Sequence, residues 1–151
     1  MKDKGELGLC YEVHGEKNKI FNLVSDSCLS INALLEEPPE KPDIGNVMTQ
    51  IGVLAKDLNG NCHRILVDVK QRSLKFNNER IVGSRTHNGI HLSKLIKKVE
   101  ISMPGCINGT SLSFRIEFNY MNGADMLKIV FSDESGLRQD SHGLMGKSIK
   151  L

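Results

Sequence analysis

Tryptophan is absent from this chain of 151 residues, and the aromatic content is only 5%. A surface that stacks nucleobases or sugar rings would therefore have few side chains available. A charge of one sign is also lacking, because 20 Lys and Arg residues balance 18 Asp and Glu residues to a net charge of +2. Proteins dedicated to nucleic acids usually carry a strongly basic face, so we expect no nucleic acid partner.

Long apolar runs are missing as well. A transmembrane helix needs about 18 or more consecutive apolar residues. No stretch approaches that length, so we expect no membrane span. The first residues, Met1–Glu6, are charged and no apolar segment follows them, which excludes a secretory signal at this end. We therefore expect either a cytosolic chain or a piece excised from a longer precursor.

The remaining composition, with 39% hydrophobic and 25% charged residues, is typical of a globular protein. The length predicts a single domain that spans residues 1–151 and can bury a real core. No internal repeat and no glycine-rich phosphate-binding loop is visible, and we expect no cofactor.

The four cysteines, Cys10, Cys28, Cys62 and Cys106, are too widely spaced for a compact zinc knuckle, which needs pairs such as C-x₂-C. Two disulfides and buried free thiols fit this spacing equally well. Four cysteines also allow three different pairings, and the sequence does not choose among them.

Apolar and polar residues alternate with a period of two along much of the chain, which is typical of half-buried strands. The pairs Asn59-Gly60 and Asn122-Gly123 are strong hairpin signals, and a further hairpin is expected around Asn77-Asn78. Three prolines fall within 36–45, which predicts an exposed loop. Strands are expected at 7–13, 20–25, 28–34, 48–56, 64–70, 112–120 and 126–132.

The segment 90–103 fits two patterns, a helical face up to Val99 and a strand that contains Val99, Ile101 and Met103. We favour a short helix or loop followed by a strand from about Lys98. Taken together, the pattern indicates an all-β fold, a mainly antiparallel sandwich or barrel with at most one short helix.

Two polar groupings suggest metal binding. The segment Asp57–Asn61 begins like a calcium-binding loop, but Cys62 and Asp68 occupy the positions where such a loop needs Gly and Glu. We favour a type I′ hairpin turn there. His87 and His91 are four residues apart, as on one face of a helix. The sequence His87-Asn88-Gly89, however, also predicts a turn, which would separate the two side chains. We therefore interpret these histidines as solvated and expect no metal ligand.

Catalytic arrangements are also excluded on geometric grounds. Neighbouring residues such as Cys62 and His63 point to opposite faces of a strand. The adjacent residues Asp140, Ser141 and His142 cannot form a hydrolase relay, because their side chains diverge along the chain. We expect no catalytic residue.

Two surface features are compatible with an extracellular role. Lys94, Lys97 and Lys98 form a small basic cluster that could contact a polyanion such as a glycosaminoglycan, although a solvated face is the simpler interpretation. Asn108 begins the N-glycosylation sequon Asn-Gly-Thr, which lies in a predicted turn.

Leu9–Val13 with Ile20–Asp26 near the start of the sequence, and Ser135–Gly146 near its end, resemble the C-terminal region of inter-alpha-trypsin inhibitor heavy chains. Leu9–Val13 followed by Ile20–Asp26 is similar to the family's L/V-C-F-N-I strand, short turn and I-L-R-L-V-x-D strand. Ser135–Gly146 is similar to its H-G-L-L-G-Q-F motif, with Met145 in place of a leucine and Lys147-Ser148 in place of Q-F. The resemblance covers most of the chain in order, with a weak middle at 78–110. The family region is itself distantly similar to von Willebrand factor type D modules.

The resemblance implies an extracellular chain that is part of a secreted precursor. In heavy chains the precursor is cut at an Asp-Pro bond, and the new terminal Asp is esterified to chondroitin sulfate and moved to hyaluronan. This chain contains no Asp-Pro bond, so that residue is not carried over. The family's partner for the first cysteine lies beyond the matched motif, and Cys28, Cys62 and Cys106 have no counterpart that can be placed.

The matched tail also has a structural interpretation. Gly143 and Gly146 bracket two apolar residues, which suits a turn whose backbone approaches the sheet closely. Asp140 and His142 in the same motif are candidate ligand residues.

These observations favour a non-catalytic extracellular interaction or processing module of a secreted or matrix-associated protein. A first alternative is a module that binds an anionic glycan through Lys94, Lys97 and Lys98. A second alternative is an intracellular protein that uses a reactive cysteine, with Cys62 beside the Asn59-Gly60 turn as the candidate.

Overall fold

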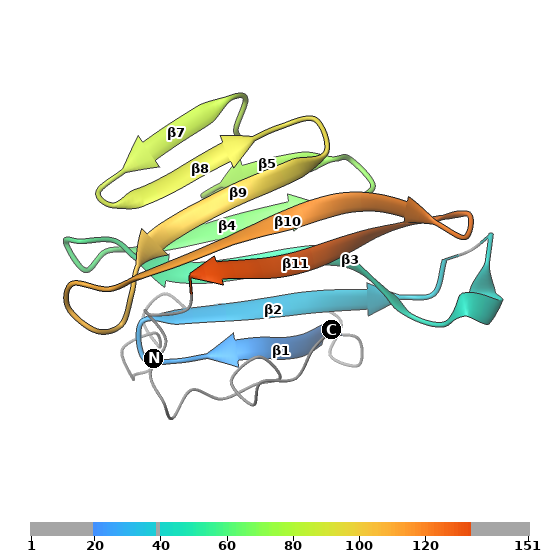
Figure 1. The fold of residues 1–151 in the computed structure, drawn as a ribbon, viewed down its shortest axis with the longest axis horizontal. Helices are drawn as coiled ribbons and strands as arrows, with labels where there is room; N and C mark the ends of the chain where they lie inside the picture. The colour runs from blue at the N-terminus through green and yellow to red at the C-terminus, as the bar shows by residue number, and fades with distance from the viewer. Residues whose placement is uncertain (1–19, 39, 134–151) are drawn as a thin grey trace.

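Two antiparallel β-sheets pack against each other in the computed structural model of the chain, which describes residues 20–38 and 40–133 (Figure 1). The first sheet has the order β1-β2-β3-β4-β5-β6 and the second has the order β11-β10-β9-β8-β7. The predicted all-β sandwich is confirmed. The strands of the first sheet are β1 (Ile20–Ser25), β2 (Leu29–Glu36), β3 (Val47–Lys56), β4 (Cys62–Asp68), β5 (Ser73–Phe76) and β6 (Glu79–Arg80). Those of the second sheet are β7 (Ser84–His87), β8 (Ile90–Lys94), β9 (Lys98–Pro104), β10 (Ser111–Met121) and β11 (Ala124–Asp133).

Each sheet is a meander, in which every described strand pairs with its neighbour in the sequence. The chain passes from one sheet to the other between β6 and β7. As Figure 1 shows, β11, the edge strand of the second sheet, lies beside β3 of the first sheet. The two hairpins β3–β4 and β7–β8, which belong to different sheets, supply the polar cluster described below.

Turns that contain asparagine connect the strands at the predicted places. In Asn77-Asn78 both residues have a positive φ, 52° and 72°, and in Asn122-Gly123 the values are 55° and 84°. The pair Asn88-Gly89 is similar, with 43° and 93°. A type I′ turn needs the left-handed conformation at both central residues, and asparagine and glycine adopt it with little strain.

Alternating side chains from both sheets form one shared core. In β10 the inward residues Leu112, Phe114, Ile116 and Phe118 are buried, as their period of two predicts, and the residues between them are more exposed. Burial of such side chains contributes roughly 1.5–3 kcal/mol each. The largest fully buried side chains elsewhere are Leu29, Ile31, Ile51, Ile65, Leu74, Ile90, Leu92, Ile101 and Met103.

The segment 90–94 is a strand, β8, where we favoured a short helix or loop. Ile90 and Leu92 are buried with a period of two. Leu95 and Ile96, which completed the helical pattern, are 42% and 84% exposed and lie before β9. Because β8 is hydrogen-bonded to β7 on one side and β9 on the other, sheet pairing outweighs the local helical pattern.

The proline-rich segment between β2 and β3 is a loop, as predicted, and it contains a short 3₁₀ helix, η2 (Pro42–Ile44). Across residues 20–38 and 40–133, no helix has the length and apolar character needed to cross a membrane.

A disulfide between Cys28 and Cys106 joins the two sheets. Cys28 lies just before β2 in the first sheet, and Cys106 follows β9 in the second. Their Cα atoms are 5.4 Å apart and 78 positions separate them in the sequence. Cys62 forms no disulfide with another described cysteine, and Cys10 lies outside the described residues. The structure thus selects one bond among the pairings that the sequence left open.

We predict that replacing Cys28 and Cys106 together by serine lowers the free energy of unfolding by about 2–5 kcal/mol, because the bond closes a long loop in the unfolded chain. Urea unfolding under oxidising conditions measures this difference. Cys62→Ser, which leaves the bond in place, is the control. Equal stability of the double variant and the unchanged protein would contradict the prediction.

Candidate functional site

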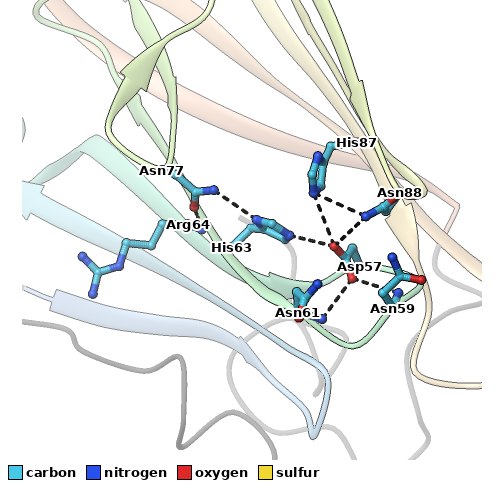
Figure 2. A network of polar contacts seen from close by, with 8 residues as sticks. All are labelled: Asp57, Asn59, Asn61, His63, Arg64, Asn77, His87 and Asn88. Atoms are coloured by element: carbon cyan, nitrogen blue, oxygen red, sulfur yellow. Dashed lines mark hydrogen bonds and ion pairs between the residues drawn. The ribbon is translucent and has the colours of Figure 1, made fainter.

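A polar cluster lies where the β3–β4 and β7–β8 hairpins meet (Figure 2). Asp57 follows β3, His63 lies in β4 and His87 ends β7. The Asp57 side chain is 0% exposed, that of His63 is 10% exposed and that of His87 is 42% exposed. Solvent exposure therefore increases across the cluster, from the fully buried carboxylate of Asp57 to the partly exposed imidazole of His87.

The turn after β3 is built around the Asp57 carboxylate. Its Oδ1 atom accepts hydrogen bonds from the backbone N–H groups of Asn59 and Asn61, both at 2.9 Å. The Asp57 carbonyl accepts a further bond from the N–H of Gly60, whose φ is 82°. The hairpin is confirmed, but the expected type I′ turn is wrong, because Asn59 does not adopt a positive φ. The carboxylate holds the Asn59 N–H and so selects a different turn.

His63 is held between two partners. Its Nε2 lies 2.8 Å from Asp57 Oδ2, and its Nδ1 lies 3.0 Å from Asn77 Nδ2. Asn77 Oδ1 accepts from the backbone N–H of Arg64, which orients the amide so that its nitrogen faces His63. Because an amide nitrogen only donates, Nδ1 accepts and Nε2–H donates to Asp57. The network therefore favours a proton on Nε2 of His63 and an accepting Nδ1.

Aromatic contacts fix the plane of the same ring. The imidazole of His63 stacks on Phe76, with centroids 5.1 Å apart and planes inclined by 21°. The edge of His87 meets the His63 ring at a centroid distance of 4.7 Å. Both imidazoles are thus oriented by packing as well as by hydrogen bonds.

His87 has only long polar contacts among the described residues. Its Nε2 lies 3.5 Å from Asp57 Oδ2 and 3.5 Å from Asn88 Nδ2, which is the outer limit of hydrogen-bond range. The neighbouring Asn88 lies 3.4 Å from Asp57 Oδ2 through its amide nitrogen, and its backbone carbonyl accepts from the N–H of Leu58 at 2.9 Å. The two turns are therefore joined by backbone and side-chain contacts.

The pKa of Asp57 is lowered from its ordinary value of 3.8 to about 2. Burial acts in the opposite direction and raises the pKa, but the hydrogen bonds from His63, Asn61, Asn88 and Asn59 together outweigh it. The cluster therefore contains a fixed negative charge at neutral pH, beside two imidazoles. Carboxylate and imidazole groups are also metal ligands, and Asp57, His63 and His87 have one ligand atom each within 4.8 Å of one another.

His87 and His91, which the sequence analysis considered as a pair, have different surroundings. His87 faces Asp57, whereas His91 is exposed on β8 and its Nδ1 lies 3.1 Å from the Thr86 hydroxyl. Cys62 is half-buried at the start of β4, next to His63 in the sequence. The ring nitrogens of His63 face Asp57 and Asn77.

The three lysines proposed for glycan binding point in different directions. Lys94 Nζ lies 5.3 Å from the centre of the Phe118 ring, on the side of the sheet that faces the core. Lys98 alternates with the buried Val99, and its Nζ lies 3.4 Å from Glu100 on the outer side. Lys97 is exposed in the turn between them.

The remaining predicted positions are placed as follows. Asn108 of the sequon is exposed in the turn between β9 and β10. Asp140, His142, Gly143 and Gly146, with Cys10, lie outside the described residues.

Sequence reasoning missed the cluster because it weighed each residue against its immediate neighbours. Asp57 and His63 flank the turn of one predicted hairpin, and His87 precedes a predicted turn, which was the available signal. Pairing of those two hairpins across the sheets was not predictable from either one alone. Comparison of the chain with protein-family models, with characterised proteins and with solved structures finds no match.

We predict that Asp57 stabilises the fold above about pH 4 and that this contribution is lost as the pH falls toward 2. The folded-state pKa lies below the unfolded value, so the unfolded chain binds the proton first on acidification. The stability difference between the unchanged protein and Asp57→Asn should shrink by about 2 kcal/mol over this window. Urea unfolding at a series of pH values measures the difference.

The matched control is Asp125→Asn, which removes an exposed carboxylate at the β10–β11 hairpin. The stability difference between this variant and the unchanged protein should change much less with pH than that of Asp57→Asn. A difference for Asp57→Asn that is independent of pH would contradict the role assigned to its charge.

Proposed function

We propose that this chain is a non-catalytic interaction module of a secreted or matrix-associated protein. The disulfide between Cys28 and Cys106 carries the proposal, because such bonds persist in oxidising compartments and are rare in the cytosol. The resemblance that we infer from the motifs at Leu9–Asp26 and Ser135–Gly146 to the C-terminal region of inter-alpha-trypsin inhibitor heavy chains points to the same role. The exposed turn at Asn108 gives an N-glycosylation acceptor a suitable place.

The polar cluster supports a binding role more than a catalytic one. A histidine that acts as a general base must present a ring nitrogen to the proton that it removes. In the described part of the chain, the two ring nitrogens of His63 face Asp57 and Asn77 instead. No hydroxyl or thiol is among these partners, so the usual nucleophile and base pair is not assembled.

The extracellular location is tested by counting thiols in the protein from its natural source. The unreduced protein is denatured, alkylated and analysed by peptide mass. We expect Cys28 and Cys106 to remain linked and unmodified. Alkylation of both residues would instead favour the intracellular alternative, and rapid alkylation of Cys62 in the native protein would then identify it as the reactive thiol.

A second candidate function, binding of an anionic glycan, is favoured by a basic hollow of about 410 Å³ at the edge of the sandwich. Arg72, Arg80 and Lys94 line it, together with the exposed apolar side chains of Val82 and Ile96. Arg72 and Lys94 both approach the Phe118 ring, at 5.5 and 5.3 Å from its centre. The structure thus groups Lys94 with two arginines of the other sheet, and not with Lys97 and Lys98.

We predict that Arg72→Gln with Arg80→Gln weakens binding to a sulfated glycan such as heparin by about tenfold, since each lost ion pair contributes up to about 1 kcal/mol. Lys97→Gln with Lys98→Gln removes the same charge outside the hollow and should have a smaller effect. Affinity chromatography and titration at low salt measure both, and added salt should weaken binding. If the protein is not retained on heparin at low salt, or if both double variants lose affinity equally, the hollow is not the glycan-binding site.

A further inference from the structure

We propose that Asp57, His63 and His87 form a binding site for a divalent transition-metal ion such as zinc. The three residues come from two hairpins of different sheets, and their ligand atoms lie within 4.8 Å of one another. This site is separate from the basic hollow and from the disulfide, so it stands independently of the function proposed above.

The spacing between Asp57 and each imidazole is close to that of a tetrahedral site. Zinc lies about 2.0–2.2 Å from imidazole nitrogen and carboxylate oxygen, which places neighbouring ligand atoms about 3.3 Å apart. Asp57 Oδ2 lies 2.8 Å from His63 Nε2 and 3.5 Å from His87 Nε2. Movements of roughly half an ångström at the first pair and less at the second would fit Asp57 to the ion. The two imidazole nitrogens lie within 4.8 Å of each other, so they would approach by at most about 1.5 Å.

The donor set favours a transition metal over calcium. Calcium takes six to eight oxygen ligands, whereas this cluster offers one carboxylate and two imidazoles. Two nitrogens with one carboxylate oxygen are typical of zinc sites that keep a fourth position for water. The exposure of His87, 42% of its side chain, gives that position a route to solvent.

Two of the three ligands are already oriented for this role. The backbone N–H groups of Asn59 and Asn61 hold Oδ1 of Asp57, which leaves Oδ2 directed toward both imidazoles. His87 Nε2 has only the 3.5 Å contacts described above. A bound ion would therefore give His87 a short partner that the metal-free arrangement lacks.

His63 must change its protonation form. A metal at Nε2 takes the position of the proton, which then resides on Nδ1 and needs an acceptor. Asn77 now presents its amide nitrogen to Nδ1, so the amide must turn over and offer its oxygen. The backbone N–H of Arg64 would lose that oxygen, and water can replace it because Arg64 is exposed.

Because metal binding requires the Asn77 amide to turn over, a variant that avoids this change provides a test of the site. A carboxylate at position 77 accepts from both the Arg64 N–H and the His63 Nδ1–H without turning over. Asp also tolerates the positive φ of 52° found at Asn77. Asn77→Asp should therefore bind the metal more tightly, by about tenfold, as expected for a partner that supports a ligating histidine.

The experiment is a zinc titration of the full chain without a histidine tag, followed by calorimetry, with cobalt absorption as a report of tetrahedral geometry. We expect one ion per chain. His87→Ala should weaken binding at least about tenfold, and it should fold, because this side chain is partly exposed. His91→Ala removes an exposed histidine from the neighbouring strand and should leave the affinity unchanged.

Lack of saturable zinc binding up to millimolar concentration would overturn the proposal. Equal effects of His87→Ala and His91→Ala would also overturn it, since binding would then reflect surface histidines in general. Weaker binding by Asn77→Asp would exclude His63 Nε2 as a ligand. Each result is obtained on folded protein and is independent of any glycan or protein partner.

Discussion

The buried charge of Asp57 is the interaction on which the junction of the two hairpins depends. A carboxylate with no solvent exposure is costly unless hydrogen bonds replace its water. Here the backbone of its own turn, a histidine of β4 and an asparagine from the β7–β8 turn supply them. One side chain thus shapes the β3–β4 turn and ties that turn to the second sheet. Elsewhere between the sheets, the disulfide of Cys28 and Cys106 joins them covalently.

Much of the fold was predictable because two-residue periodicity and asparagine turns are local signals. The alternation in β10 and the turns at Asn77-Asn78 and Asn122-Gly123 needed only neighbouring residues. The prediction for the segment 90–94 was wrong because it also relied on local signals. The spacing of Leu92, Leu95 and Ile96 fits a helix, and only pairing with neighbouring strands shows that the segment is a strand. The choice of Cys106 as the partner of Cys28 depends on how the sheets stack, which sequence spacing does not contain.

The site was predictable only in pieces. The β3–β4 hairpin was recognised, but of the β7–β8 hairpin only the turn at Asn88-Gly89 was. Asp57 and His87 were both considered as metal ligands, with different companions in each case. Their approach depends on packing between sheets, as does the separation of Lys94 from Lys98. Histidine side chains can also serve either as a hydrogen-bonded part of a core or as ligands, and only geometry distinguishes the two. The expected functional residues beyond position 133 lie outside the described residues.

The tautomer of His63 tests the central claim most directly, because the network of Asp57, His63 and Asn77 requires one form. Proton–nitrogen correlation spectra of the imidazole nitrogens, recorded on the metal-free protein at neutral pH, distinguish the two forms. The account predicts a proton on Nε2 that is protected from exchange with water, and transfer of that proton to Nδ1 when zinc is added. A proton on Nδ1 in the metal-free protein, or rapid averaging between both nitrogens, would contradict the network.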